Sequence, residues 1–167
     1  MEQQQQQQMK EQMEMLSAYS YGLCWSYCTN FLVVITNVAG THGYCDPVYI
    51  NTGILTKESD VYSFGVVLFE VLCGRSCFMN VNDERRFLAK LALSCYKKGN
   101  LNDIIDIDLK KQMNSDSLNM FSEIAYLCLQ DDPKQRPSMG WVVEKLEKAL
   151  QLQVSSIFFE RFSIYGS

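Results

Sequence analysis

Histidine is nearly absent from this sequence, since His42 is the only one among 167 residues. The seven cysteines are odd in number and contain no Cys-x-x-Cys pair, which argues against a zinc module or a secreted disulfide framework. Cys24 and Cys28, like Cys73 and Cys77, are one helical turn apart, but a single histidine does not complete a metal-ligand set. We expect reduced, mostly buried thiols in a reducing compartment.

Positive charge is also scarce. The chain has 15 Lys and Arg against 19 Asp and Glu, a formal net charge of −4. The basic residues are scattered among acidic ones, whereas nucleic-acid-binding proteins usually carry a basic stripe, so we expect no nucleic-acid partner. The length and the 47% hydrophobic content fit one soluble globular domain.

The first 36 residues lack the patterns of a packed domain. Residues 1–14 are Gln-rich without an apolar period, which predicts a disordered segment or a frayed helix. Residues 15–36 carry no charged side chain, and polar residues interrupt them except at the apolar run 31–35. The flanking charges do not match a signal peptide or a positive-inside anchor. We therefore expect an irregular segment with one strand, the alternative being a membrane segment over residues 15–36.

Helical patterns begin near residue 56. Residues 61–72 are rich in Val, Tyr and Phe, which alone would favour a strand, but their length and flanks favour a buried helix that is apolar on all sides. Further helices are expected over residues 83–98, over 117–129, and after a cap at Ser138. The tail, residues 154–167, has no assigned role. The predicted fold class is mostly α.

Three motifs, in order and at matching distances, resemble one family. The stretches VAGTHGYCDP (residues 38–47) and TGILT (52–56) resemble the end of a kinase activation segment. SDVYSFGVVLFE (59–70) resembles the buried central helix of the kinase C-lobe, and CLQDDPKQRPSM (128–139) resembles the closing motif of that lobe. Together they resemble the plant receptor-like Ser/Thr protein kinases. The resemblance implies an incomplete C-lobe over residues 37–153, with the N-lobe absent.

The resemblance implies a role for each matched position. Thr41 would lie in the loop that receives the substrate residue, and Asp60 would hydrogen-bond the backbone of the catalytic loop. Arg136 would form a buried ion pair with a glutamate at the end of the activation segment. Four further positions would be structural: Gly40, Gly43, Asp46 and Pro47. Without the family, Thr41 is a turn hydroxyl, Asp60 a helix cap, and Arg136 a surface charge.

Two positions depart from the family pattern. Val48 stands where the family has the glutamate, so Arg136 is expected to lose its partner, at a cost of ~3–5 kcal/mol. Ser20, in the stretch SYGL, stands where the Asp of an Asp-Phe-Gly motif would fall. A neutral hydroxyl cannot replace a carboxylate as the Mg²⁺ ligand, so Ser20 marks a degenerate metal-ligand position.

Most of the phosphotransfer machinery has no counterpart in the sequence. There is no Gly-x-Gly-x-x-Gly, no Val-Ala-Ile-Lys and no His-Arg-Asp, and residues 1–36 are expected to be too few for an N-lobe. We therefore expect no catalytic residue, no metal and no cofactor, although the family uses ATP and Mg²⁺. Asp103, Asp106 and Asp108 could suggest a metal site, but they also match a family loop before a helix.

The favoured function is a truncated receptor-like Ser/Thr kinase fragment without phosphotransfer activity of its own. One alternative is a pseudokinase-type interaction module, whose partners would be other kinases or receptor complexes. The other is one part of an active ATP-dependent Ser/Thr kinase whose N-terminal portion is missing from this sequence. The resemblance implies a cytoplasmic location, because kinase domains of this family face the cytosol at the plasma membrane.

Overall fold

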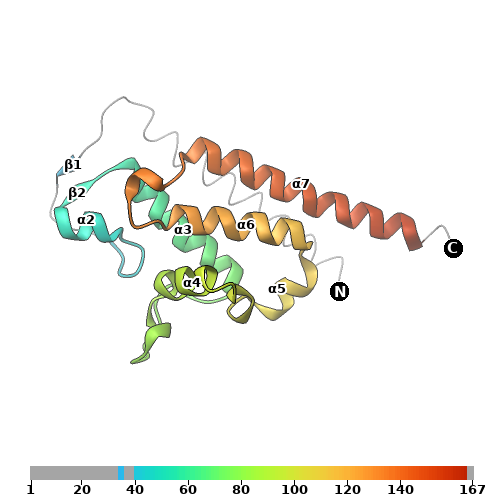
Figure 1. Ribbon diagram of the computed structural model, residues 1–167, viewed down its shortest axis with the longest axis horizontal. Helices are drawn as coiled ribbons and strands as arrows, with labels where there is room; N and C mark the ends of the chain where they lie inside the picture. Colours follow the sequence, from blue (N-terminus) through green and yellow to red (C-terminus); the bar gives the residue numbers. More distant parts are fainter. Residues whose placement is uncertain (1–33, 36–39, 165–167) are drawn as a thin grey trace.

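A computed structural model describes residues 34–35 and 40–164 of the chain (Figure 1). The expectations for residues 1–14, for Ser20 and for most of residues 15–36 lie outside these residues. The elements follow one another as β1 (Val34–Ile35), α2 (Pro47–Thr52), β2 (Ile54–Leu55), α3 (Lys57–Cys73), η1 (Glu84–Arg86), α4 (Leu88–Lys97), η2 (Leu101–Asp103), α5 (Ile107–Gln112), α6 (Ser115–Cys128), η3 (Pro133–Gln135) and α7 (Met139–Ile164). The three η elements are 3₁₀ helices. The mostly α fold class is confirmed.

Helix α3 is the centre of the hydrophobic core. It begins after Thr56 with a capping box to Ser59 and ends at Gly74, which has left-handed backbone angles. Most of its apolar side chains are buried, whereas Val67 and Val71 are half-buried on the face that also carries Asp60, Ser63 and Glu70. Tertiary packing therefore overrides the strand propensity of its Val, Tyr and Phe residues.

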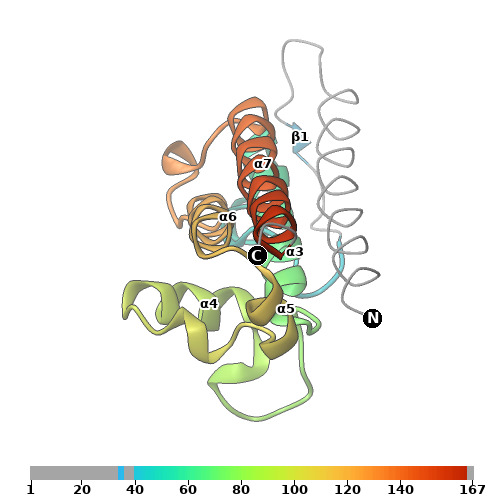
Figure 2. The ribbon, with the colours of Figure 1, turned by 90° about the vertical axis from the view of Figure 1, so that its right-hand side faces the viewer.

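Helices α6 and α7 pack beside α3. Figure 2 views α6 and α7 nearly end on and shows them side by side, with α4 and α5 below them. At the α3–α6 contact, a Cβ added to Gly65 would lie 2.7 Å from Cβ of Cys128, so only glycine permits this approach. The Ser117 hydroxyl, fully buried, donates a 2.8 Å hydrogen bond to the carbonyl oxygen of Ala149 and joins α6 to α7.

Two expected helix boundaries differ from the structure. The helix expected over residues 83–98 is interrupted at Phe87, whose extended backbone pairs with Phe78 in an isolated bridge. Helix α6 starts two residues before Ser117, because the Asn114 side chain caps it by accepting hydrogen bonds from the amides of residues 116 and 117. Helix α7 extends through Ile164 and includes most of the tail to which no role was assigned.

The carboxylate cluster near residue 106 is explained by helix capping. The Asp106 side chain accepts hydrogen bonds from the backbone N–H groups of Asp108 and Leu109, at 3.0 and 2.9 Å, and so starts α5. Asp108 pairs with Lys111 on the surface. In the part of the chain that the structure describes, no group of three or more His, Cys, Asp or Glu side chains could hold a metal ion.

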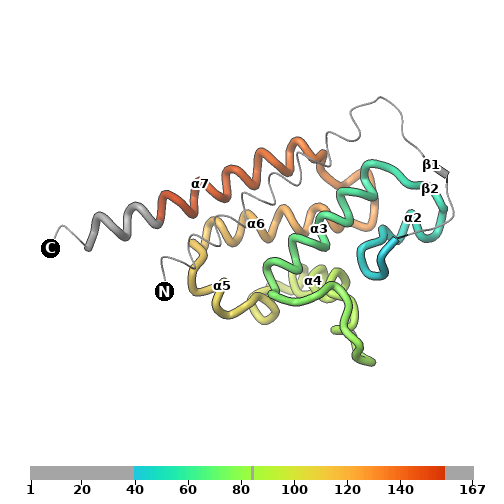
Figure 3. The backbone as a smooth tube through the Cα atoms, turned by 180° about the vertical axis from the view of Figure 1, so that it is seen from behind, coloured from blue at the N-terminus to red at the C-terminus, as the bar shows by residue number. Residues whose placement is uncertain are grey.

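Strands β1 and β2 form a short antiparallel pair in which Val34 faces Leu55 and Ile35 faces Ile54. Within residues 34–35 and 40–164, no helix is both long enough and apolar enough to cross a lipid bilayer. Figure 3 shows from behind that α2 and the segment between α3 and α4 lie at the same end of the molecule.

Candidate functional site

The residues matched to the substrate-receiving loop form a turn that leads into α2. This stretch, residues 40–46, is called the 40–46 loop below. The amide of Tyr44 donates to the carbonyl oxygen of Thr41 at 3.2 Å and closes the turn. Gly43 has a φ of 98°, and a Cβ there would lie 2.8 Å from Sγ of Cys77, so glycine is required on both grounds. Thr41 and His42 are exposed to solvent.

Tyr44 fastens the loop to α3. Its hydroxyl donates to the Glu70 carboxylate, 2.8 and 2.9 Å from the two oxygens, and Glu70 also accepts from the backbone N–H of Cys77 at 2.6 Å. The Ser63 hydroxyl donates to the carbonyl oxygen of Tyr44 at 2.9 Å. The hydrogen bond to Glu70, followed by burial, raises the pKa of Tyr44 well above its usual value. Tyr44 therefore stays neutral and remains a donor.

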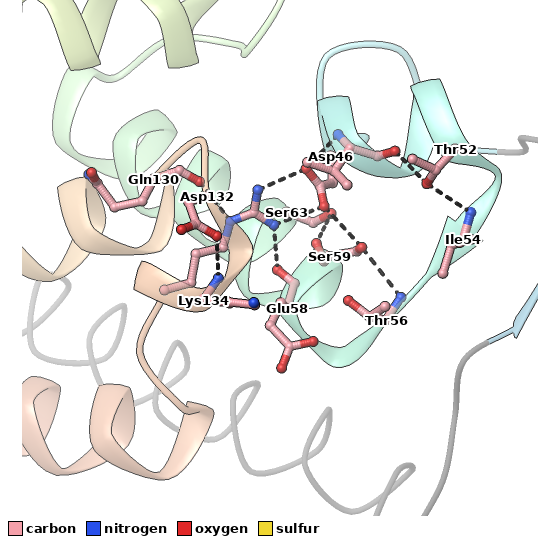
Figure 4. A network of polar contacts seen from close by, with 12 residues as sticks. Asp46, Thr52, Ile54, Thr56, Glu58, Ser59, Ser63, Gln130, Asp132 and Lys134 are labelled. Atoms are coloured by element: carbon pink, nitrogen blue, oxygen red, sulfur yellow. Dashed lines mark hydrogen bonds and ion pairs between the residues drawn. The ribbon is translucent and has the colours of Figure 1, made fainter.

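A buried ion pair fastens the last residue of the loop. Nη1 and Nη2 of Arg136 lie 2.8 and 2.9 Å from the two carboxylate oxygens of Asp46, and the side chains are 0% and 1% exposed. Asp46 also accepts hydrogen bonds from the Ser59 hydroxyl and from the backbone N–H of Val48, each at 3.0 Å (Figure 4). Asp46 thus combines the capping of α2 with the neutralisation of a buried cation.

The expectation that Arg136 is left without a partner is wrong. Residue 48 is valine, but the carboxylate two positions earlier takes the guanidinium. Nε of Arg136 also donates to the carbonyl of Gln130 at 2.8 Å, and Nη1 donates to the carbonyl of Glu58 at 2.9 Å. Asp46 was predicted only as a structural position of the family motif, and its pairing depends on the loop and the segment before α7 meeting in space.

Three other positions that the family resemblance assigned are Thr41, Pro47 and Asp60. Pro47 begins α2, and the Thr41 side chain faces solvent. The Asp60 carboxyl is half-buried, and burial raises its pKa. Among the described residues its side chain has no hydrogen bond or ion pair.

An aromatic cluster beside the loop was not predicted from the sequence. The His42 ring lies 5.4 Å, edge to face, from the rings of both Phe78 and Phe87, and these two rings are 5.6 Å apart. The carbonyl of His42 also accepts a weak hydrogen bond from the Cys77 thiol at 3.8 Å. The prediction that His42 lies in a turn agrees with its backbone, and the ring contacts add a second anchor for the exposed part of the loop.

These contacts hold the 40–46 loop against α3 and the segment before α7. Charge-assisted hydrogen bonds fix Tyr44 and Asp46, partly buried at Tyr44 and buried at Asp46, and the His42 ring packs against Phe78 and Phe87. Thr41, which precedes these anchors, faces solvent.

The sequence is similar to known proteins over most of its length. Residues 9–149 match the family model for the protein kinase domain. The chain is 49% identical over 121 residues to the receptor-like protein kinase ANXUR1 and 48% identical over 124 residues to the receptor-like protein kinase FERONIA, both from Arabidopsis thaliana. These matches cover 72% and 74% of this chain, and the chain spans only 14% of the length of each of these curated relatives.

Proposed function

Because the chain belongs to the protein kinase family, we propose that it provides the substrate-loop region of a plant receptor-like Ser/Thr kinase and transfers no phosphate by itself. One observation carries the proposal: Tyr44 and Asp46 anchor the 40–46 loop through charge-assisted hydrogen bonds, in a sequence without a Gly-rich loop or a His-Arg-Asp motif. We expect this loop to receive a peptide, whereas the motifs that would bind and transfer the phosphate have no counterpart in the sequence.

The chemical requirements of phosphoryl transfer support the proposal that this chain transfers no phosphate by itself. Phosphoryl transfer requires groups that cradle the phosphates, carboxylates that hold Mg²⁺, and a base beside the attacking hydroxyl. Asp60, half-buried and in the first turn of the central helix, is the described carboxylate for which we propose a role beside that machinery. A single carboxylate cannot hold ATP and Mg²⁺, so neither is expected to bind this chain alone.

The test is a phosphotransfer assay on the purified chain. With radiolabelled ATP, Mg²⁺ and a generic Ser/Thr substrate, we expect no incorporation above that of the Asp60→Ala variant. The thermal midpoint should also stay constant as Mg-ATP is added, since a ligand stabilises only a folded state that binds it. Incorporation above the variant, or a midpoint that rises with ATP concentration, would refute the proposal.

Asp60 also favours a second candidate, in which this sequence is one part of a longer active kinase. A half-buried carboxyl without a hydrogen bond among the described residues is a group that a further segment could satisfy. The coding sequence upstream decides this candidate: an in-frame Gly-rich loop and His-Arg-Asp would support it. A polypeptide that includes them should transfer phosphate and lose most of that activity in the Asp60→Ala variant.

The same proposal predicts where the chain is located in the cell and which proteins it binds. We expect it on the cytosolic side of the plasma membrane, bound to other kinases or receptor complexes as a non-catalytic module. Titration of the labelled chain with an isolated receptor-like kinase domain measures this directly. Absence of binding at micromolar concentrations of that domain would remove the interaction-module alternative.

A further inference from the structure

Positive charge is concentrated between the end of α3 and the end of α4. Residues 74–98 contain six Lys and Arg but only two Asp and Glu, in a chain whose net charge is −4. Arg85 pairs with Asp83. Arg86 and Lys90 are exposed and pair with no carboxylate whose side chain the structure describes. These two cations are the subject of the inference.

Arg86 and Lys90 lie on the aromatic cluster that holds the 40–46 loop. Cζ of Arg86 is 5.1 Å from the ring centre of Phe78 and 5.6 Å from that of Phe87, and Nζ of Lys90 is 5.9 Å from the Phe87 ring. The same two phenylalanine rings contact His42. Both cations are therefore separated from the loop by no more than one aromatic ring. Figures 1 and 3 show the α3–α4 segment projecting at the end of the molecule where α2 lies.

The position of these cations is unfavourable for the free protein. Helix α4 begins at Leu88, has no acidic residue in its first turn, and has no side-chain cap. The start of a helix carries partial positive charge and favours anions, so Arg86 just before it and Lys90 within its first turn are the reverse of the stabilising arrangement. Helix stability does not explain this concentration of charge, and a bound anion would relieve the repulsion.

We propose that Arg86 and Lys90 bind the anionic groups of an acidic peptide segment docked beside Thr41. The inference rests on the proposed function, because it places that peptide at the substrate loop. The guanidinium of arginine binds carboxylate or phosphate oxygens through two parallel hydrogen bonds, and lysine adds a compact charge. The aromatic rings under both cations restrict their motion before binding, which reduces the entropy lost on association.

A peptide fits this surface better than an anionic membrane. Within the α3–α4 segment, Met79 is the one large apolar side chain, among those described, that is clearly exposed, at 39%. One such side chain offers little apolar area for insertion into a lipid interface. The 40–46 loop beside the cations, by contrast, is anchored at His42, Tyr44 and Asp46, and a peptide site requires such a fixed backbone.

The experiment compares three fluorescein-labelled peptides by anisotropy with the full chain. Each contains one serine followed by four positions, which are glutamate in the first, glutamine in the second, and glutamine with the serine phosphorylated in the third. The Arg86→Gln/Lys90→Gln variant is compared with Lys110→Gln/Lys134→Gln, which removes two exposed lysines on α5 and η3. The first and third peptides distinguish carboxylate from phosphate as the preferred anion.

We expect at least one anionic peptide to bind about tenfold more tightly than the glutamine peptide. The Arg86→Gln/Lys90→Gln variant should lose most of that preference, and the control variant should keep it within about twofold. Added salt should weaken the preference, because the cations are exposed. If circular dichroism shows that the double variant is unfolded, the single variant Lys90→Gln replaces it. That variant should lose part of the preference for the anionic peptide.

Equal binding of all three peptides would overturn the inference, and so would an equal loss in the control variant. Binding to vesicles of phosphatidylserine and phosphatidylcholine without any peptide binding would assign the cations to a membrane instead. The proposed function is tested by a different measurement. Phosphate incorporation in the kinase assay would refute the proposed function, whereas the peptide comparison contains no ATP and tests only the docking inference. A negative peptide result with no phosphotransfer would refute the docking inference alone.

Discussion

Arg136 holds both carboxylate oxygens of Asp46 across 90 positions of sequence, and both side chains are almost completely excluded from solvent. The pair joins the end of the 40–46 loop to the segment that precedes α7. Because Asp46 also accepts from Ser59 and caps α2, one carboxylate connects three parts of the chain. The conformation of the 40–46 loop therefore depends on this side chain.

Replacing Asp46 by asparagine should destabilise the fold by about 3–5 kcal/mol, because a buried guanidinium loses its counter-charge. Asparagine can still cap α2, so the variant isolates the charge from the cap. Urea unfolding followed by circular dichroism measures the free energy of unfolding. The matched control is Asp108→Asn on the surface pair with Lys111, which should change stability by less than about 1 kcal/mol.

A double-mutant cycle with Arg136→Met checks that the two residues act through each other. The combined Asp46→Asn/Arg136→Met variant should be less destabilised than the sum of the single changes, with a coupling of about 0.5–3 kcal/mol. Strict additivity would mean that the loop and the α7 segment do not meet as described.

The substitution Val48→Glu should not stabilise the protein, since Asp46 already neutralises the guanidinium of Arg136. A second carboxylate near Asp46 would repel it, so a loss of up to about 1 kcal/mol is expected. In the Asp46→Asn background the same substitution should recover part of the lost stability, because Arg136 then lacks a carboxylate. The free energies of unfolding of the four combinations provide the check. A gain of more than about 1 kcal/mol in the otherwise unchanged protein would contradict the pairing with Asp46.

Gly65→Ala should destabilise the contact between α3 and α6 by about 1–3 kcal/mol, because the new Cβ would lie 2.7 Å from Cβ of Cys128. Gly140→Ala is the matched control: it is also in a helix, but its Cβ would meet nothing within 4 Å. There the higher helix propensity of alanine should give a gain of up to about 1 kcal/mol. Thermal midpoints of the two variants should move in opposite directions, and a shift in the same direction would contradict the packing at Gly65.

Stability should fall as the pH rises above about 9. Burial raises the pKa of the Cys73 and Cys128 thiols to about 12, from the ordinary value of 9.0 that they regain on unfolding. Between these values the folded state keeps protons that the unfolded state releases, so alkaline pH favours unfolding. Tyr62, whose pKa burial raises to about 12, adds to the loss above pH 10.

Urea unfolding between pH 7 and 10.5 in the presence of a reductant measures this slope. The Cys73→Ala/Cys128→Ala variant should be less stable at pH 7 but should lose stability less steeply with rising pH, since it lacks the two thiols whose pKa is raised to about 12 and keeps, among the described residues, only Cys77 and Cys95 as buried thiols. An unchanged slope in this variant would show that other groups dominate the alkaline titration.

The sequence was sufficient to predict elements whose burial is uniform or whose caps are local. Helix α3 was expected as a buried helix because of the length and flanks of its apolar-rich run, although its residue types alone favour a strand. Ser138 was correctly expected to cap α7, where its hydroxyl accepts from the amide of Trp141 at 3.2 Å. The kinase family was also predicted correctly, from three motifs in the matching order and at matching distances.

The sequence could not supply contacts between residues that are distant along the chain. A carboxylate at position 46 or one at position 48 fits the same motif, and only the path of the loop decides which of the two reaches Arg136. Phe87 lies inside a helical pattern, but its pairing with Phe78 breaks that pattern for a reason outside the local window. The site beside the loop consists mainly of such pairings.

The 90-residue separation of Asp46 and Arg136 has a kinetic consequence. Closing a flexible loop of that length costs about 4 kcal/mol of chain entropy, so the pair should form only after α3, α6 and α7 have packed and brought its ends together. Interactions that form after the transition state govern the unfolding rate and leave the folding rate nearly unchanged. The ion pair should therefore form after the transition state of folding. Its loss should raise the unfolding rate and shorten the lifetime of the native state, while the folding rate stays nearly unchanged.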